Sequence, residues 1–154
     1  MLDRFDRKIL ELLQRDSNQS TRALAEQVSL SVSACAERVK KLERSGLIKG
    51  YQALLDADAL GQNHIVFVEV TLNHSDQSVF KAFAQAVQAR PEVQSCHMVA
   101  GGFDYLLKVR GRDIHEYRQF LGDVLTQLPD VRSTHTYVVM ETIKDQATLA
   151  IHQG

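Results

Sequence analysis

Hydrophobic residues recur with a helical period between residues 20 and 45, and polar residues interrupt this period once. The interruption is Ser29-Leu30-Ser31, which predicts two short helices joined by a tight turn. Ser20 can cap the first helix. Gly46 can end the second in a left-handed conformation, with Leu47 as the apolar contact that follows such a cap. The pair therefore has the layout of a helix-turn-helix motif.

A third helix is expected ahead of this pair, capped by Asp3. The apolar positions of this helix are Phe5, Ile9, Leu12 and Leu13. These residues would supply the core that a helix-turn-helix needs. We therefore predict a DNA-binding domain over residues 1–48 and a linker over residues 49–63.

The second helix of the motif has one apolar and one basic face. Cys35, Val39 and Leu42 stand at i, i+4 and i+7, which predicts a buried stripe. An α-helix fits the major groove of B-DNA, so small residues in its first turn can approach base edges while later cations reach phosphates. The residues predicted to contact double-stranded DNA are Ser31, Ser33, Ala34, Glu37, Arg38, Lys40, Lys41 and Arg44. The alternative is a basic face that is only solvated surface.

The charge of the chain supports DNA binding only when its two halves are compared. The whole chain has a formal net charge of −1. Residues 1–50 contain 10 Lys and Arg against 7 Asp and Glu, whereas residues 51–154 contain 8 against 12. The basic charge is thus concentrated in the helix-turn-helix half, which is consistent with a protein that docks one end on phosphates.

The composition places the protein among soluble globular proteins. A hydrophobic content of 44% argues against disorder. The chain has no apolar run of about 18 residues and no signal-peptide layout at its start. We therefore expect a cytoplasmic protein that associates with the nucleoid and not with membranes.

After residue 63 the pattern changes to alternation, which predicts strands separated by two helices. The predicted elements are a strand at Ile65–Leu72, a helix at Asp76–Arg90, strands at Val93–Ala100 and Phe103–Arg110, a helix at Asp113–Leu128 and a strand at Val131–Thr142. The inward residues expected on the two helices are Phe80, Phe83 and Val87 on the first, and Ile114, Tyr117, Leu121 and Val124 on the second.

The central strands are joined by Gly101-Gly102, which suits a tight hairpin with positive φ. The order βαββαβ predicts a ferredoxin-like domain over residues 64–154. The fold class is therefore α+β, with an N-terminal winged or plain helix-turn-helix domain and a C-terminal ferredoxin-like domain.

Both faces of the predicted sheet are expected to be apolar. On the last strand, Tyr137 and Val139 point one way, and Val138 and Met140 point the other. Two helices on one side leave the other face open, and apolar patches of several hundred Å² are usually interfaces. We therefore expect a homo-oligomer built sheet to sheet, whose dimer aligns two recognition helices with two operator half-sites.

Several short segments, in this order and spacing, resemble the Lrp/AsnC family of leucine-responsive, feast/famine transcriptional regulators. The segments that carry the resemblance are Leu2-Asp3-Arg4, Cys35 through Arg38, Leu42-Glu43 with Gly46, Gly50-Tyr51, Val66-Phe67-Val68-Glu69, Phe103 through Lys108 and Thr136 through Glu141. The resemblance implies a sequence-specific DNA-binding regulator that senses an amino acid through its C-terminal domain. It also implies dimers that often assemble into octamers.

Two positions depart from the usual pattern of the family. The family usually has prolines at the start of the recognition helix, where this chain has Val32 and Ala34, so the entry into the helix is expected to be looser. The hairpin commonly carries an acidic residue where this chain has Gly102. We therefore expect the polar contacts around the effector to differ.

An amino-acid effector needs an acidic partner for its ammonium, N–H donors for its carboxylate and a cavity for its side chain. The central hairpin offers Asp104 as the acidic partner and the glycine backbone as the donors. The residues predicted from this chemistry and from the resemblance are Met98, Ala100, Gly101, Gly102, Phe103, Asp104, Tyr105, Thr134, Thr136 and Val138. The lining has no obvious second charge, which favours leucine or methionine. The alternative for Asp104 is that it only caps the hairpin.

Other chemistry has little support. Cys35 and Cys96 predict neither a disulfide nor a zinc site, and Cys96 and His97, as neighbours on a strand, point to opposite faces and cannot chelate one metal. No cofactor beyond the effector is expected. An enzyme would need a catalytic set, a phosphate loop or metal spacing that this sequence does not offer. A further alternative is an amino-acid sensor whose N-terminal helices bind protein instead of DNA.

Overall fold

The computed structural model describes residues 2–123 and 125–151, and it divides the chain into two compact units. The first unit extends to Leu54 and includes the tail from Lys144, and the second is Leu55–Ile143. The predicted boundary assigned the tail to the second domain. The tail groups with the first unit because the Gln14 amide donates to Leu149 O at 3.1 Å and accepts from Leu149 N at 2.6 Å.

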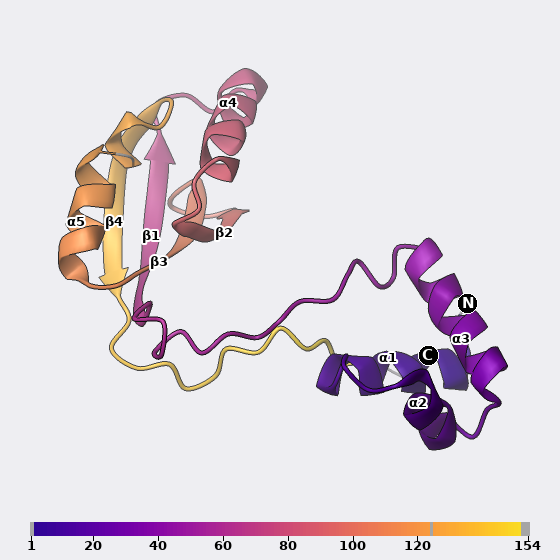
Figure 1. Cartoon of the computed structure of the whole chain (residues 1–154). Coiled ribbons are helices and arrows are strands. Elements are labelled where there is room, and N and C mark those ends of the chain that lie inside the picture. The colour runs from indigo at the N-terminus through magenta and orange to yellow at the C-terminus, as the bar shows by residue number, and fades with distance from the viewer. Residues whose placement is uncertain (1, 124, 152–154) are drawn as a thin grey trace. The chain divides into compact units, whose positions relative to one another are not determined.

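The first unit contains three helices, and the sequence correctly predicts the N-caps of the first two (Figure 1). These helices are α1 (Arg4–Arg15), α2 (Thr21–Val28) and α3 (Val32–Arg44). Asp3 Oδ1 accepts from the backbone N–H groups of Phe5 and Asp6 at 2.8 and 2.9 Å, and Ser20 Oγ accepts from Ala23 at 3.2 Å. Ser29 ends α2 with φ +56°, and α3 begins three residues later, so the turn is tight.

The apolar stripes of the three helices meet in one core. Ile9 and Cys35 are fully buried, and Leu42 is 3% exposed. Gly46 adopts φ +75°, as predicted for the end of α3. The prediction for Leu47 is wrong, because its side chain is 54% exposed. Ile48 takes its place: its N–H donates to Leu42 O at 3.2 Å and its side chain packs against the core.

The second unit confirms the predicted βαββαβ order. Its elements are β1 (His64–Leu72), α4 (Gln77–Gln88), β2 (Val93–Met98), β3 (Tyr105–Gly111), α5 (Ile114–Asp123), the short 3₁₀ helix η1 (Leu125–Gln127) and β4 (Val131–Val138). The strands form one sheet in the order β2-β3-β1-β4, and every pair is antiparallel. This is the ferredoxin-like topology expected from the sequence. Among the described residues, no helix is long and apolar enough to cross a membrane.

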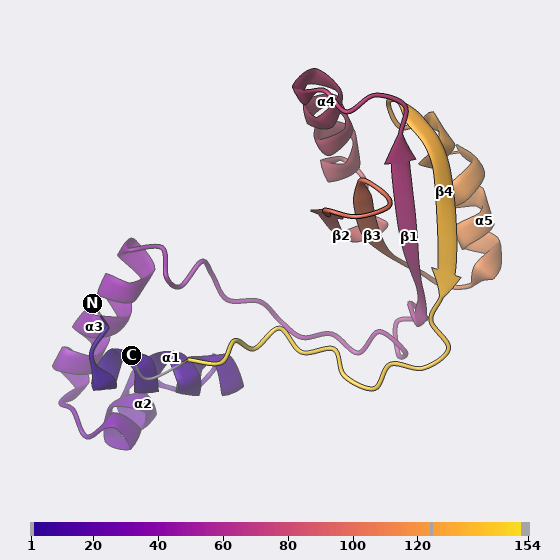
Figure 2. The same ribbon diagram turned by 180° about the vertical axis from the view of Figure 1, so that it is seen from behind.

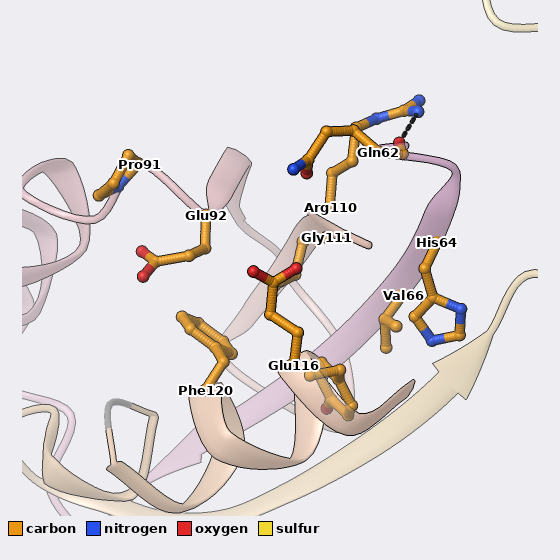
Figure 3. A pocket seen from close by; sticks show the side chains of 11 residues that line it. Gln62, His64, Val66, Pro91, Glu92, Arg110, Gly111, Glu116 and Phe120 are labelled. Atoms are coloured by element: carbon orange, nitrogen blue, oxygen red, sulfur yellow. Dashed lines mark hydrogen bonds between the residues drawn. The ribbon is translucent and has the colours of Figure 1, made fainter. Parts of the chain in front are cut away.

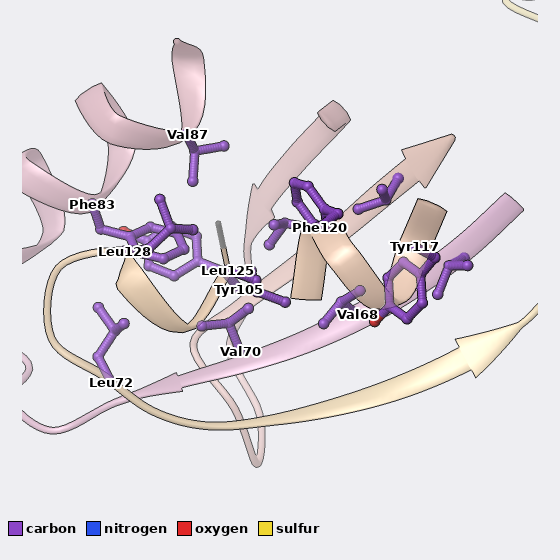
Figure 4. Packing of buried hydrophobic residues seen from close by; sticks show 13 residues of the cluster. Val68, Val70, Leu72, Phe83, Val87, Tyr105, Tyr117, Phe120, Leu125 and Leu128 are labelled. Atoms are coloured by element: carbon purple, nitrogen blue, oxygen red, sulfur yellow. The ribbon is translucent and has the colours of Figure 1, made fainter. Parts of the chain in front are cut away.

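One face of the sheet packs against both helices (Figure 4). Val66, Val68 and Val70 alternate along β1 and are at most 1% exposed. The Phe83 ring of α4 stacks on the Tyr105 ring with 4.4 Å between centroids. The predicted inward set of the second helix needs correction, because Ile114 lies in the first turn of α5 and is 49% exposed whereas Phe120 is 5% exposed.

The predicted ends of several elements are also too long. The second helix was expected to reach Leu128, but α5 ends at Asp123 and η1 follows. Val124, predicted to point inward, lies outside the described residues. The last strand ends at Val138 and not at Thr142.

The other sheet face carries no helix of this unit (Figure 2) and is less apolar than predicted. Cross-strand pairing places Phe67 beside Tyr137 and Glu69 beside His135 on this face. Tyr137 donates from its hydroxyl to Glu69 Oε1 at 3.1 Å. The prediction of two apolar faces is therefore wrong in part, since aromatic and charged side chains alternate on the open face.

The connection between the central strands is wider than a two-glycine hairpin. β2 ends at Met98 and β3 begins at Tyr105, so six residues separate them. Neither Gly101 nor Gly102 adopts a positive φ in the left-handed region, which corrects the prediction of a tight turn. Instead, Val99 N–H donates to Asp104 O and Asp104 N–H donates to Val70 O, both at 3.0 Å. These bonds tie the loop to the end of β1.

Candidate DNA interface and effector site

The exposed face of α3 carries most of the residues predicted to contact DNA. Ser31 caps the helix by accepting from Ala34 N–H at 3.2 Å, and the exposed Ser33 lies in the first turn. The remaining exposed residues of the predicted set are Ala34, Glu37, Lys40, Lys41 and Arg44. Ser33, Glu37, Lys41 and Arg44 are spaced at i, i+4, i+8 and i+11, so they follow one side of the helix.

Glu37 is the acidic member of this exposed face and pairs with two of its cations. Its carboxylate lies 3.7 Å from Lys40 Nζ and 3.9 Å from Arg44 Nη2. All three side chains are more than 60% exposed, with values of 69% for Glu37, 64% for Lys40 and 73% for Arg44. Such exposed pairs contribute little to stability. Lys41 has no ion pair with any described residue, so its charge is available to a polyanion.

Arg38 does not share the exposed face, which corrects the prediction that it points outward. Its Nη1 lies 2.6 Å from Asp3 Oδ2 and 2.7 Å from Asp6 Oδ1. The guanidinium carbon also lies 5.3 Å from the centroid of the Phe5 ring. Arg38 therefore joins the recognition helix to the first turn of α1.

The electrostatics of this cluster follow from its geometry. The Asp6 side chain is 8% exposed and the Arg38 side chain 31% exposed. The hydrogen bond from Arg38 to Asp6 is the largest influence that raises the pKa of the guanidinium, and the hydrogen bond to Asp3 is the next largest. The backbone N–H of Asp6 is the largest influence that lowers the pKa of Asp3, and Arg38 adds to it. The cluster is therefore a half-buried ion-pair contact between α1 and α3. Sequence reasoning missed it because Arg38 is more than thirty residues from both partners.

In the second unit, Asp104 occupies the most constrained position of the predicted effector site. Its Oδ2 accepts from Leu72 N–H at 2.8 Å, where an irregularity in the β1–β4 pairing falls between Thr71 and Leu72. Its Oδ1 has no hydrogen-bond partner among the residues that the structure describes. Asp104 therefore caps the end of β1 rather than the hairpin itself, and keeps one carboxylate oxygen for another donor.

The other predicted effector residues divide into two groups. Met98, Ala100, Gly101 and Gly102 are exposed around the loop, and Phe103 is half-buried there. Tyr105 is 4% exposed and belongs to the core, so only its backbone is available to a ligand at the loop. Thr134 pairs with Val70, near the point where the loop is anchored.

Thr136 and Val138 lie away from the loop. The Thr136 hydroxyl is 2.6 Å from the Tyr117 hydroxyl on the helix side of the sheet. Val138 pairs with Val66, four residues before Val70 on β1, which is about 13 Å along a strand. One chain therefore does not bring the whole predicted set to one place.

The two cysteines have structural positions. Cys35 is buried in the core of the first unit, and Cys96 packs against the core of the second from β2. Cys96 pairs with Leu107 and His97 with Leu106, so the two side chains point to opposite faces. Within the residues that the structure describes, no three His, Cys, Asp or Glu side chains could hold one metal ion.

Comparison with known proteins accounts for both units. The Lrp/AsnC ligand binding domain matches residues 65–149. The winged helix-turn-helix DNA-binding domain matches residues 2–49. These assignments agree with the sheet domain and with the three-helix unit described above.

Full-length relatives extend this result. The chain is 50% identical over 150 residues to the leucine-responsive regulatory protein of Escherichia coli K12, covering 97% of this chain and 92% of that protein. A crystal structure of a transcriptional regulator from Neisseria meningitidis in complex with L-Met matches with a TM-score of 0.92 and 32% identity over 97% of each chain. An AsnC family regulator from Agrobacterium tumefaciens matches with a TM-score of 0.92 and 34% identity over 97% of each chain.

The comparisons confirm the predicted fold class and the prediction of a DNA-binding transcriptional regulator. They reject the alternatives of an enzyme and of a sensor that does not bind DNA. The chain therefore belongs to the Lrp/AsnC family of transcriptional regulators, with an N-terminal DNA-binding domain and a C-terminal ligand-binding domain.

Proposed function

We propose that the exposed face of α3 lies in the major groove and that this contact gives the protein its operator specificity. The observation that carries the proposal is the one-sided composition of α3. Its buried side packs through Cys35 and Leu42, while its exposed side begins with Ser33 and Ala34 and continues with cations. Small residues permit close approach to base edges, and the cations that follow meet phosphates.

Replacing Lys41 by Gln tests this placement. The variant is expected to bind promoter and random duplex more weakly to a similar degree, and its plot of log affinity against log salt is expected to be shallower by about 1. The measurement is fluorescence anisotropy with labelled duplex between low and moderate salt. Glu37→Gln is the matched control, since it removes the carboxylate that pairs with Lys40 and Arg44 and is expected to tighten binding. If the wild type, Lys41→Gln and Glu37→Gln gave equal slopes of log affinity against log salt, α3 would not be part of the DNA interface.

We further propose that the effector is a free amino acid, leucine or methionine, and that it binds at the loop over residues 98–104. Asp104 supports this proposal through Oδ1, the carboxylate oxygen that has no hydrogen-bond partner among the described residues. The relative from Neisseria meningitidis was solved with L-Met, which supports an apolar amino acid as the ligand class. Because Thr136 and Val138 lie away from the loop, we propose that a neighbouring subunit completes the site.

We propose that the protein is a homo-oligomer, at least a dimer, that assembles towards an octamer. Support comes from large apolar side chains with high exposed fractions, namely 95% for Leu54, 94% for Met140, 84% for Ile143 and 52% for Tyr137. Exposed apolar surface of this extent marks interaction sites. A dimer would present two copies of α3 to two half-sites. We place this assembly in the cytoplasm, on the nucleoid.

Light scattering at micromolar concentration tests the oligomer. The wild-type chain is expected to scatter as a dimer or a multiple of it. Tyr137→Asp is expected to shift the population to smaller species, because it places a carboxylate beside Glu69 on the open sheet face. A wild-type monomer at this concentration would contradict the proposal.

Effector binding and DNA binding would be coupled through this assembly. Linkage is reciprocal, so an effector that changes subunit association changes DNA affinity by the same coupling energy, typically about 1–3 kcal/mol. We propose a change of oligomeric state as the mechanism of regulation.

A further inference from the structure

The second unit contains a cavity of about 220 Å³ that lies away from the proposed effector loop (Figure 3). It opens on the helix side of the sheet at the start of β1, between α5 and the segment that precedes β2. Val66, Val109 and Phe120 form an apolar part of its wall. The volume is below the roughly 300–1,000 Å³ typical of sites for drug-sized ligands, so it suits a smaller molecule.

Two buried polar atoms at this cavity have no hydrogen-bond partner among the described residues. They are Oε2 of Glu92 and Nε2 of His64, and both residues line the cavity. Buried polar groups are nearly always paired, and an unpaired carboxylate oxygen is costly to leave without a donor. The unpaired carboxylate oxygen of Glu92 beside the cavity therefore indicates that a ligand supplies a donor to it.

The other charged side chains at the cavity already have hydrogen-bond partners among the described residues. Glu116 accepts from the backbone N–H of Arg112 at 2.5 Å and pairs with its guanidinium at 3.3 Å. Arg110 donates to Gln62 O at 2.8 Å and to Gln94 Oε1 at 3.1 Å. Among the described residues, Oε2 of Glu92 is therefore the buried carboxylate atom at this cavity that has no hydrogen-bond donor. The ligand that fits is a cation with N–H donors.

We propose that this cavity binds a small primary amine whose ammonium donates to Glu92 and whose apolar body lies against Val66, Val109 and Phe120. An ammonium has three N–H donors and a positive charge, which matches the unpaired carboxylate. A zwitterionic amino acid fits less well, because its own carboxylate would face Glu92 and Glu116. The site is thus distinct from the effector loop in position and in ligand class: it takes the type of molecule that remains when an amino acid loses its carboxyl group.

Three ligands with a common carbon skeleton test the proposal by calorimetry on the full chain. They are isoamylamine, which has only the ammonium, 4-methylpentanoate, which has only the carboxylate, and leucine, which has both. Isoamylamine is expected to bind the wild-type protein, and 4-methylpentanoate is expected not to bind this site. Glu92→Gln keeps the size of the side chain and removes its charge, so it is expected to weaken isoamylamine binding at least tenfold.

A second variant separates this site from the effector loop. Asp104→Asn is expected to bind isoamylamine as the wild type does, while its response to leucine is reduced. Thermal unfolding monitored by circular dichroism checks that both variants are folded. No heat from isoamylamine with the wild type, equal binding by Glu92→Gln, or loss of binding in Asp104→Asn would each overturn the proposal. None of these results alters the case for leucine at the loop.

Discussion

Replacing Arg38 by Met is expected to lower the free energy of unfolding of the first unit by about 2–3 kcal/mol. The reason is that Asp6, 8% exposed, loses the cation that lies 2.7 Å from its carboxylate. Breaking a fully buried ion pair costs about 3–5 kcal/mol, and the smaller value here reflects the 31% exposure of Arg38. Denaturant unfolding followed by circular dichroism measures the change. Hydrogen exchange of the α1 and α3 amides assigns it to this unit.

A double variant shows whether the ion pair is responsible. Asp6→Leu combined with Arg38→Met removes the stranded carboxylate, so it is expected to be more stable than Arg38→Met alone. The contrary result would be an Arg38→Met protein of unchanged stability that binds DNA much more weakly. Arg38 would then contact DNA directly, as the sequence pattern suggested.

Arg38 shows what sequence reasoning can and cannot decide in the first unit. The caps at Asp3 and Ser20 and the stripe through Cys35 and Leu42 are local features, and the structure has all of them. The direction of Arg38 is not local, because it lies at the edge of that stripe. The crossing of α1 with α3 decides which way it turns, and no periodicity within one helix contains that information.

The second unit shows the same division between local and tertiary information. The alternation of buried and half-buried positions along β1 is local, since it depends only on the two-residue period of a strand. The burial of Phe120 in place of Ile114 depends on how α5 is rotated against the sheet. The position of Val138 relative to Asp104 depends on the β1–β4 register. The sequence therefore predicts the effector residues as one site, whereas in a single chain some of them lie far from the others.

Replacing Asp104 by Asn is expected to weaken leucine or methionine binding by about 10- to 150-fold, which corresponds to about 1.5–3 kcal/mol for a hydrogen bond to a charged group. In the wild type, Leu72 N–H donates to Asp104 Oδ2 at 2.8 Å. The amide oxygen of the variant can accept the same hydrogen bond, so the end of β1 stays capped. The variant loses only the negative charge of the Asp104 carboxylate, which we propose binds the effector ammonium. Calorimetry with leucine and with methionine measures the affinity, and circular dichroism measures the stability.

Asp104→Ala separates binding from structure. This variant loses both the charge and the acceptor for Leu72 N–H, so it is expected to lose the effector and also some stability, about 1–3 kcal/mol for an unpaired buried N–H. If Asp104 only caps the loop, Asp104→Asn will bind leucine normally and Asp104→Ala alone will be destabilised. If Asp104 holds the ammonium, both variants will bind the effector more weakly while their affinity for DNA without effector stays at the wild-type value.

The reciprocity of linkage makes DNA affinity a second measurement of the same contact. In the wild type, saturating leucine is expected to change DNA affinity by the coupling energy, and DNA is expected to change leucine affinity by an equal factor. In Asp104→Asn the leucine concentration needed for this change rises by the factor lost in affinity, while the size of the change at saturation is preserved. A reduced size at saturation would mean that Asp104 also takes part in the transition between oligomeric states.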